Sequence, residues 1–135
     1  MAGMSADLSY AVAGVFAVLA GLLHGYIWYL ESYAWTTRAR GVFGTTREQA
    51  EATKELAFNQ GYYNLFAGIL ALLGAYDLVS GSRVSGTALV VAACGTMLGA
   101  ALVLVLSNRS RVRPALIQGT LPALALVFLL IAHVA

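Results

Sequence analysis

Four long apolar stretches dominate the pattern of hydrophobic and polar positions along the chain. Residues 56–76, 84–108 and 114–135 contain no Asp, Glu, Lys or Arg, and residues 8–30 contain no formal charge, with His24 their only group that titrates near neutral pH. Each stretch reaches the roughly 20 residues that a helix needs to cross a hydrocarbon core of about 30 Å. The pattern therefore predicts four transmembrane helices, at residues 8–30, 54–77, 84–107 and 114–134.

The composition agrees with an all-α membrane protein. The 135 residues are 60% hydrophobic and 10% charged, whereas about a quarter of the residues of an average soluble domain are charged. We therefore expect one integral membrane domain over residues 1–135, a bundle of four transmembrane helices. A removable signal peptide does not fit the first span, because no basic segment precedes it, its apolar run is long, and three more spans follow.

The basic residues lie mainly in two of the three connections. Four of the eight Lys and Arg residues lie between Glu31 and Glu55, three lie within residues 109–113, and the second connection has only Arg83. The first and third connections of a four-span protein share one side, so the positive-inside rule predicts cytoplasmic basic loops and both termini outside the cell membrane. Anionic lipid head groups explain these basic loops better than nucleic acid does.

The long first connection, residues 31–53, is predicted to be amphipathic and to lie at the cytoplasmic interface. Its segment YAWTTRARGVFG, residues 33–44, mixes aromatic and basic side chains, a composition typical of an interfacial anchor. Thr45 and Glu48 form a candidate capping box, so we expect the second long helix to begin near Thr46.

Nearly all strongly polar residues of the spans lie at one depth in this topology, the cytoplasmic part of the bundle, and the exception is His133 at the outer end. His24, Trp28 and Glu31 follow the spacing i, i+4, i+7 and share one helix face. Gln60 and Asn64 are also one turn apart. Unpaired polar atoms facing lipid are costly, so we expect these side chains to face the bundle interior or a hydrated cavity.

Together these positions predict one polar pocket at the cytoplasmic side. Asn59 fits it least well, because it lies about 100° around the helix from Gln60. His24 and Glu31 are the candidates for acid–base catalysis. The candidates for binding a lipophilic substrate are Trp28, Asn59, Gln60, Tyr63, Asn64 and Gln118.

A structural interpretation of the same residues stays open. Asn and Gln can join helices through hydrogen bonds of roughly 0.6–2 kcal/mol each. His24 can donate to a backbone carbonyl, and Glu31 can be a carboxylate at a helix end that reaches the membrane surface.

Two segments also resemble a known family. HGYIWYLE at residues 24–31, followed by Trp35 and by AFNQGYYNLFAG at residues 57–68, is similar to the HxYIxxLE…NQGxYNxFLA pattern of a family of small bacterial integral membrane proteins with four helices. The NQGxYN block is the most specific part, and the resemblance spans essentially the whole chain. It supports the membrane fold and emphasises the positions His24, Glu31, Asn59, Gln60 and Asn64, but it implies no activity.

Three kinds of function fit these observations. The first is an enzyme that isomerises, cyclises or opens an epoxide in a lipophilic substrate through acid–base groups. The second is a small oligomeric proton-coupled transporter, for which Glu31 is the candidate carboxylate. The third is a non-catalytic lipid-binding subunit. Its working surface would be the patterns GLLHG (21–25) and GTMLG (95–99), which allow close helix contacts within the bundle or in a homo-oligomer.

Several classes of site are absent from the sequence. There is no GxxxxGK[ST] loop, no HExxH motif and no cluster of Cys and His, so we expect no bound nucleotide cofactor or metal ion. The single Cys94 cannot form an internal disulfide or a CxxC pair, which argues against quinone reduction through vicinal thiols. His24 and His133 are predicted on opposite sides of the membrane and cannot share a metal.

Overall fold

The computed structural model describes residues 4–135 of the chain, and the elements of this part are all helical. Four of the helices are long and apolar enough to cross a membrane, which confirms the all-α, four-helix class and the multi-pass membrane architecture. In chain order the elements are α1 (Ala6–Tyr33), α2 (Arg38–Phe43), α3 (Arg47–Ser80), α4 (Arg83–Ser107), the short 3-10 helix η1 (Arg109–Arg111) and α5 (Val112–Val134).

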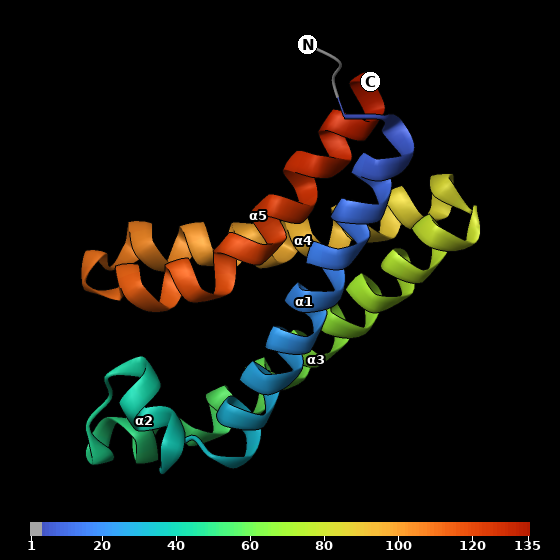
Figure 1. Cartoon of the computed structure of the whole chain (residues 1–135). Helices are drawn as coiled ribbons and strands as arrows, with labels where there is room; N and C mark the ends of the chain where they lie inside the picture. Colours follow the sequence, from blue (N-terminus) through green and yellow to red (C-terminus); the bar gives the residue numbers. More distant parts are fainter. Residues whose placement is uncertain (1–3) are drawn as a thin grey trace.

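The long helices form a ring in which each packs mainly against two others. Helix α1 packs against α3 and α5, and α4 packs against the same two helices, so α1 and α4 lie at opposite corners. Figure 1 shows α1 and α3 side by side, with the C-terminal end of α5 beside the start of α1 and α2 at the other end of α1. We call this other end, where α2 connects α1 to α3, the α2 end of the bundle.

Contacts between chain segments agree with this arrangement. At the end of the bundle where the two termini lie, Arg83, the first residue of α4, forms an ion pair with Asp7 at the start of α1, at 2.5 Å. At the α2 end, the guanidinium of Arg111 in η1 donates to the backbone carbonyl of Phe43 in α2. The two basic connections therefore lie at the same end of the molecule.

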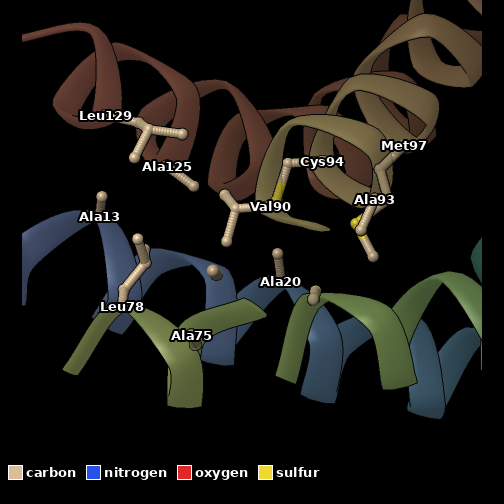
Figure 2. Close-up of a cluster of buried hydrophobic side chains, with 12 residues drawn as sticks. Ala13, Ala20, Ala75, Leu78, Val90, Ala93, Cys94, Met97, Ala125 and Leu129 are labelled. Carbon is tan, nitrogen blue, oxygen red and sulfur yellow. The ribbon is translucent and has the colours of Figure 1, made fainter. Parts of the chain in front are cut away.

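The main core is built largely from small side chains (Figure 2). All four long helices contribute to it, and seven of its twelve buried residues are alanines. The core residues are Ala13, Ala17, Ala20, Ala71, Ala75, Leu78, Val90, Ala93, Cys94, Met97, Ala125 and Leu129. Small side chains allow helix backbones to approach closely, and the packing of this core depends on that approach.

The glycine patterns contribute to this packing unequally. A Cβ atom on Gly68 of α3 would lie 2.8 Å from the carbonyl oxygen of Gly21 on α1, so the backbones of α1 and α3 touch at this point. In contrast, a Cβ on Gly25, Gly95 or Gly99 would meet no atom within 4 Å. Of the two glycine patterns in the sequence, only Gly21 therefore makes a tight contact within the chain.

A regular stripe of buried positions runs along α1 and leads from the core to the α2 end. After Ala13, Ala17 and Ala20, the stripe continues with His24, Ile27 and Glu31. The steps alternate between four and three residues, which keeps all six side chains on one helix face. The imidazole of His24 and the carboxylate of Glu31 therefore lie on the same face of α1 as the buried Ala13, Ala17 and Ala20.

Helix α3 begins where the sequence predicts, but its capping box lies one residue further along. Thr46 is the N-cap, its side chain accepts from the backbone N–H of Gln49, and the Gln49 side chain accepts from the backbone N–H of Thr46. The expected pair was Thr45 and Glu48. Two overlapping T-x-x-E/Q patterns occur here, and the structure uses the second.

Both prolines lie within α5. Pro114 lies in the first turn, where a missing backbone N–H removes no helical hydrogen bond. Pro122 lies inside the helix, and Figure 1 shows α5 changing direction partway along its length. The bend follows from the loss of one backbone hydrogen bond and from the bulk of the proline ring.

Candidate functional site

The carboxylate of Glu31 is held between two side-chain amides of the neighbouring helix. Glu31 lies in the last turn of α1 and is only 5% exposed. Gln60 Nε2 donates to its Oε1 at 3.2 Å, and Asn64 Nδ2 donates to its Oε2 at 2.7 Å. Each carboxylate oxygen therefore has one amide donor, and hydrogen bonds to an ionised group are about twice as strong as neutral ones.

Gly61 allows α1 and α3 to approach closely enough for these contacts. A Cβ atom at this position would lie 2.2 Å from Ser32 Oγ and 3.1 Å from the carbonyl oxygen of Trp28. Ser32 Oγ also donates to the carbonyl of Phe58, at 3.0 Å. Gly61 therefore permits a close helix contact, and this contact brings Gln60 and Asn64 within reach of Glu31.

His24 lies deeper on the same face of α1 and does not bond to Glu31. It is 1% exposed, and its Nδ1 lies 2.9 Å from the carbonyl oxygen of Ala20. Because a carbonyl only accepts, Nδ1 carries a proton, and in the neutral ring Nε2 is then a free acceptor. No residue of the described chain forms a hydrogen bond with Nε2. His24 and Glu31 are seven residues apart, about 10 Å along the helix axis.

Trp28 belongs to an aromatic cluster beside this site. Its ring meets those of Tyr33 and Tyr62 edge-on, with centroids 5.7 and 5.9 Å apart, and the hydroxyls of these two tyrosines are 2.7 Å apart. The indole Nε1 of Trp28 is buried and has no hydrogen-bond partner among residues 4–135. Phe58 and Phe66 extend the cluster along α3.

Four members of this cluster were not predicted from the sequence, which pointed to Tyr63 in place of the adjacent Tyr62: they are Tyr33, Phe58, Tyr62 and Phe66. The signal was the spacing of Phe58, Tyr62 and Phe66, which recur every four residues and therefore share one helix face. Tyr63 itself is 70% exposed. Asn59 is also exposed, and neither Asn59 nor Tyr63 forms a hydrogen bond with Glu31 in the described part of the chain.

Gln118 lies apart from Glu31. It lines a small cavity of about 60 Å³ between α1, α2 and α5, whose other walls are apolar or aromatic. The lining residues are Leu23, Tyr26, Ile27, Leu30, Val42, Phe43, Pro114, Ile117 and Gln118. Hydrogen bonds therefore join Glu31, Gln60 and Asn64. His24 and Trp28 lie on α1, within two turns of Glu31. Gln118 lines the cavity between α1, α2 and α5 and forms no hydrogen bond with this group in the described chain.

The site offers hydrogen-bond and proton-transfer chemistry. A carboxylate can accept about four hydrogen bonds, and the structure assigns two of these to Glu31. Each oxygen therefore has a lone pair that no residue of the described chain uses. Among residues 4–135, no group of three or more His, Cys, Asp or Glu side chains is placed to hold a metal ion.

Comparison with known proteins places the chain in a family without assigning chemistry to it. No curated protein and no solved structure matches the chain significantly. A family model described as "Protein of unknown function (DUF1304)" matches residues 18–130, a range that contains every candidate residue from His24 to Gln118. The match covers most of the chain, which therefore belongs to the DUF1304 family.

Proposed function

We propose that this protein is a membrane enzyme that performs acid–base chemistry on a lipophilic substrate at the α2 end of the bundle, on the cytoplasmic side. The observation that carries the proposal is the buried carboxylate of Glu31, bound on both oxygens by amides. Removing an ion from water costs several kcal/mol. A carboxylate needed only at the helix end could avoid this cost by reaching the membrane surface, and Glu31 does not.

The roles follow from the geometry. Glu31 takes a proton from the substrate or returns one, while Gln60 and Asn64 hold its two oxygens in fixed positions. His24 supplies a second group that can carry a proton, two turns further along the same face. The rings of Trp28 and Tyr62 form an aromatic surface for the apolar part of the substrate.

Access to the carboxylate is through Gln60. The Gln60 side chain is exposed while it donates to Glu31 Oε1. A change of its side-chain rotamer uncovers that oxygen without moving either helix. Isomerisation fits such a site well, because the proton taken from one carbon is returned to another and no other reactant is consumed.

The test compares lipid extracts from cells that express wild type, Glu31→Gln or Glu55→Gln. Gln at position 31 keeps the size of the side chain but cannot take up a proton, and Glu55 is an exposed carboxylate on α3 that serves as the matched control. We expect mass spectrometry to find a lipid species that depends on wild type and on Glu55→Gln but is lost with Glu31→Gln. Identical extracts from all three would contradict the enzyme proposal. Altered solute tolerance with unchanged lipids would favour transport instead.

A further inference from the structure

A second feature lies on the other side of the bundle, between α4 and α5. An apolar groove of about 230 Å³ runs between these helices, which lie alongside each other in Figure 1. Its walls are Leu98, Ala101, Leu102, Val105, Val112, Ala115, Leu116, Gly119, Thr120 and Ala123. A Cβ atom on Gly119 would lie 2.8 Å from Cβ of Ala101, so the helices touch there, and the exposed Leu116 (62%) marks an open side.

The length of the groove matches one leaflet of a bilayer. Its wall on α5 runs from Val112 to Ala123, a rise of about 16 Å at 1.5 Å per residue. Half of a hydrocarbon core of about 30 Å is close to this length. The groove is therefore long enough for a single acyl chain to lie along it over about this length.

The surface end of the groove is positively charged and lacks neutralising partners. Val112 lies between Arg111 and Arg113, and Arg109 precedes them in η1. The sequence contains no Asp or Glu after Asp77. The structure gives no ion pair to Arg109 or Arg113 in the described part of the chain, where the one salt bridge is that of Arg83.

The start of α5 adds to this positive end. Its N-cap residue, Arg111, provides no side-chain cap, and its first turn contains no acidic residue. No carboxylate therefore offsets the positive end of the helix dipole at this point. Arg111 itself is occupied, because its guanidinium donates to the carbonyl of Phe43 in α2.

We propose that the groove between α4 and α5 binds one anionic phospholipid. An acyl chain lies along the apolar walls, and the phosphate lies at Arg109 and Arg113, whose planar guanidinium groups match phosphate oxygens well. The apolar walls alone would accept any lipid, so the basic end is what selects a negatively charged head group. This site is independent of the chemistry proposed for Glu31.

The first test measures head-group selectivity by native mass spectrometry of the full-length protein released from detergent micelles. Phosphatidylglycerol and phosphatidylcholine with identical acyl chains are added in equal amounts. We expect wild type to retain phosphatidylglycerol preferentially, and the double variant Arg109→Gln/Arg113→Gln to lose this preference by roughly ten- to thirty-fold. The matched control is Arg38→Gln/Arg47→Gln, which removes two arginines from the other basic connection and should keep the wild-type preference.

The second test measures the contribution of the acyl chain. Thr120→Phe places a ring at the rim of the groove and should reduce retention of both lipids, whereas Val127→Phe, at a half-exposed position of α5 outside the groove, should not. Soluble glycerophosphoglycerol, which lacks acyl chains, should not displace the lipid. Equal retention of the two lipids by wild type would overturn the proposal. So would an equal loss of preference in the Arg38→Gln/Arg47→Gln control, an unaffected Thr120→Phe variant, or a dimer whose formation excludes lipid.

Discussion

Asn64 Nδ2 lies 2.7 Å from Glu31 Oε2, so a carboxylate near the end of one membrane-spanning helix is bound by an amide of its antiparallel neighbour. This contact joins the most polar parts of α1 and α3. It gives a physical reason for Gln60 and Asn64 within the charge-free residues 56–76 of α3, because a buried carboxylate without donors would be strongly disfavoured.

Asn64→Leu should destabilise the protein, because it removes the shorter of the two hydrogen bonds to Glu31. We expect the free energy of unfolding in detergent to fall by about 1.5–3 kcal/mol, the usual range for a hydrogen bond to a charged group. Asn59→Leu is the matched control, since Asn59 is an exposed amide on the same helix, and its effect should stay within about 0.5 kcal/mol. Equal effects of the two variants would show that the hydrogen bond from Asn64 to Glu31 does not stabilise the fold.

Gly61→Ala should force α1 and α3 apart, because the new Cβ would lie 2.2 Å from Ser32 Oγ. Overpacking of this kind typically costs about 1–3 kcal/mol, and thermal unfolding in detergent measures it. Gly25→Ala meets open space, so it should be neutral or stabilise α1 by up to about 1 kcal/mol.

The clash at Gly61 can also be assigned to its partner. Adding Ser32→Ala to Gly61→Ala removes the atom at 2.2 Å but leaves the carbonyl of Trp28 at 3.1 Å. We therefore expect the double variant to recover part of the lost stability, so that the two changes are not additive. Strict additivity would show that the hydroxyl of Ser32 does not limit the approach of the helices.

Tyr62→Phe and Tyr63→Phe should differ although the residues are adjacent. The hydroxyl of Tyr62 lies 2.7 Å from that of Tyr33, so its removal should cost about 0.5–1.5 kcal/mol of stability. The 70% exposed Tyr63 forms no such contact in the described chain, and Tyr63→Phe should leave the unfolding temperature unchanged. A larger effect at Tyr63 would indicate that it contacts another molecule.

The predicted orientation can be tested by cysteine labelling in intact cells. In a Cys94→Ala background, a cysteine at Ser5 should react with a membrane-impermeant maleimide, and a cysteine at Ser110 should react only after the cells are permeabilised. Both positions are exposed, so the difference reports the side of the membrane. The reverse result would place the Glu31 site at the outer face.

The spans and the inward face of α1 could be predicted because they depend on local pattern. Charge-free stretches define the helices, and the helical period places Glu31 on the same face as His24. The period does not say which of two adjacent residues meets a neighbour, since Tyr62 and Tyr63 differ by only about 100° around the axis. The pairing of Glu31 with Asn64 likewise depends on the separation of two helices, which Gly61 sets.

The position of Gln118 around α5 depends on a different kind of contact. The sequence predicts that Gln118 lies at the same depth in the membrane as Glu31, because both residues are close to the same end of their spans. Gln118 lines a cavity together with residues of α2, so its neighbours depend on where α2 packs against α5. Residues 31–53 contain no pattern that determines this packing. The glycines present a similar problem. Gly21 and Gly25 belong to one pattern, but only Gly21 has a neighbouring backbone against it.

The stripe from Ala13 to Glu31 limits how the site can open. The core and the polar residues occupy the same face of α1, so rotating this helix far enough to expose Glu31 would also turn the alanines out of the core. A single residue inserted between Ala20 and His24 would leave the alanines in the core but would turn His24 and Glu31 by about 100° around the helix axis, away from α3. We therefore expect α1 and α3 to keep their relative positions, so that Glu31 becomes accessible only when side chains such as Gln60 move.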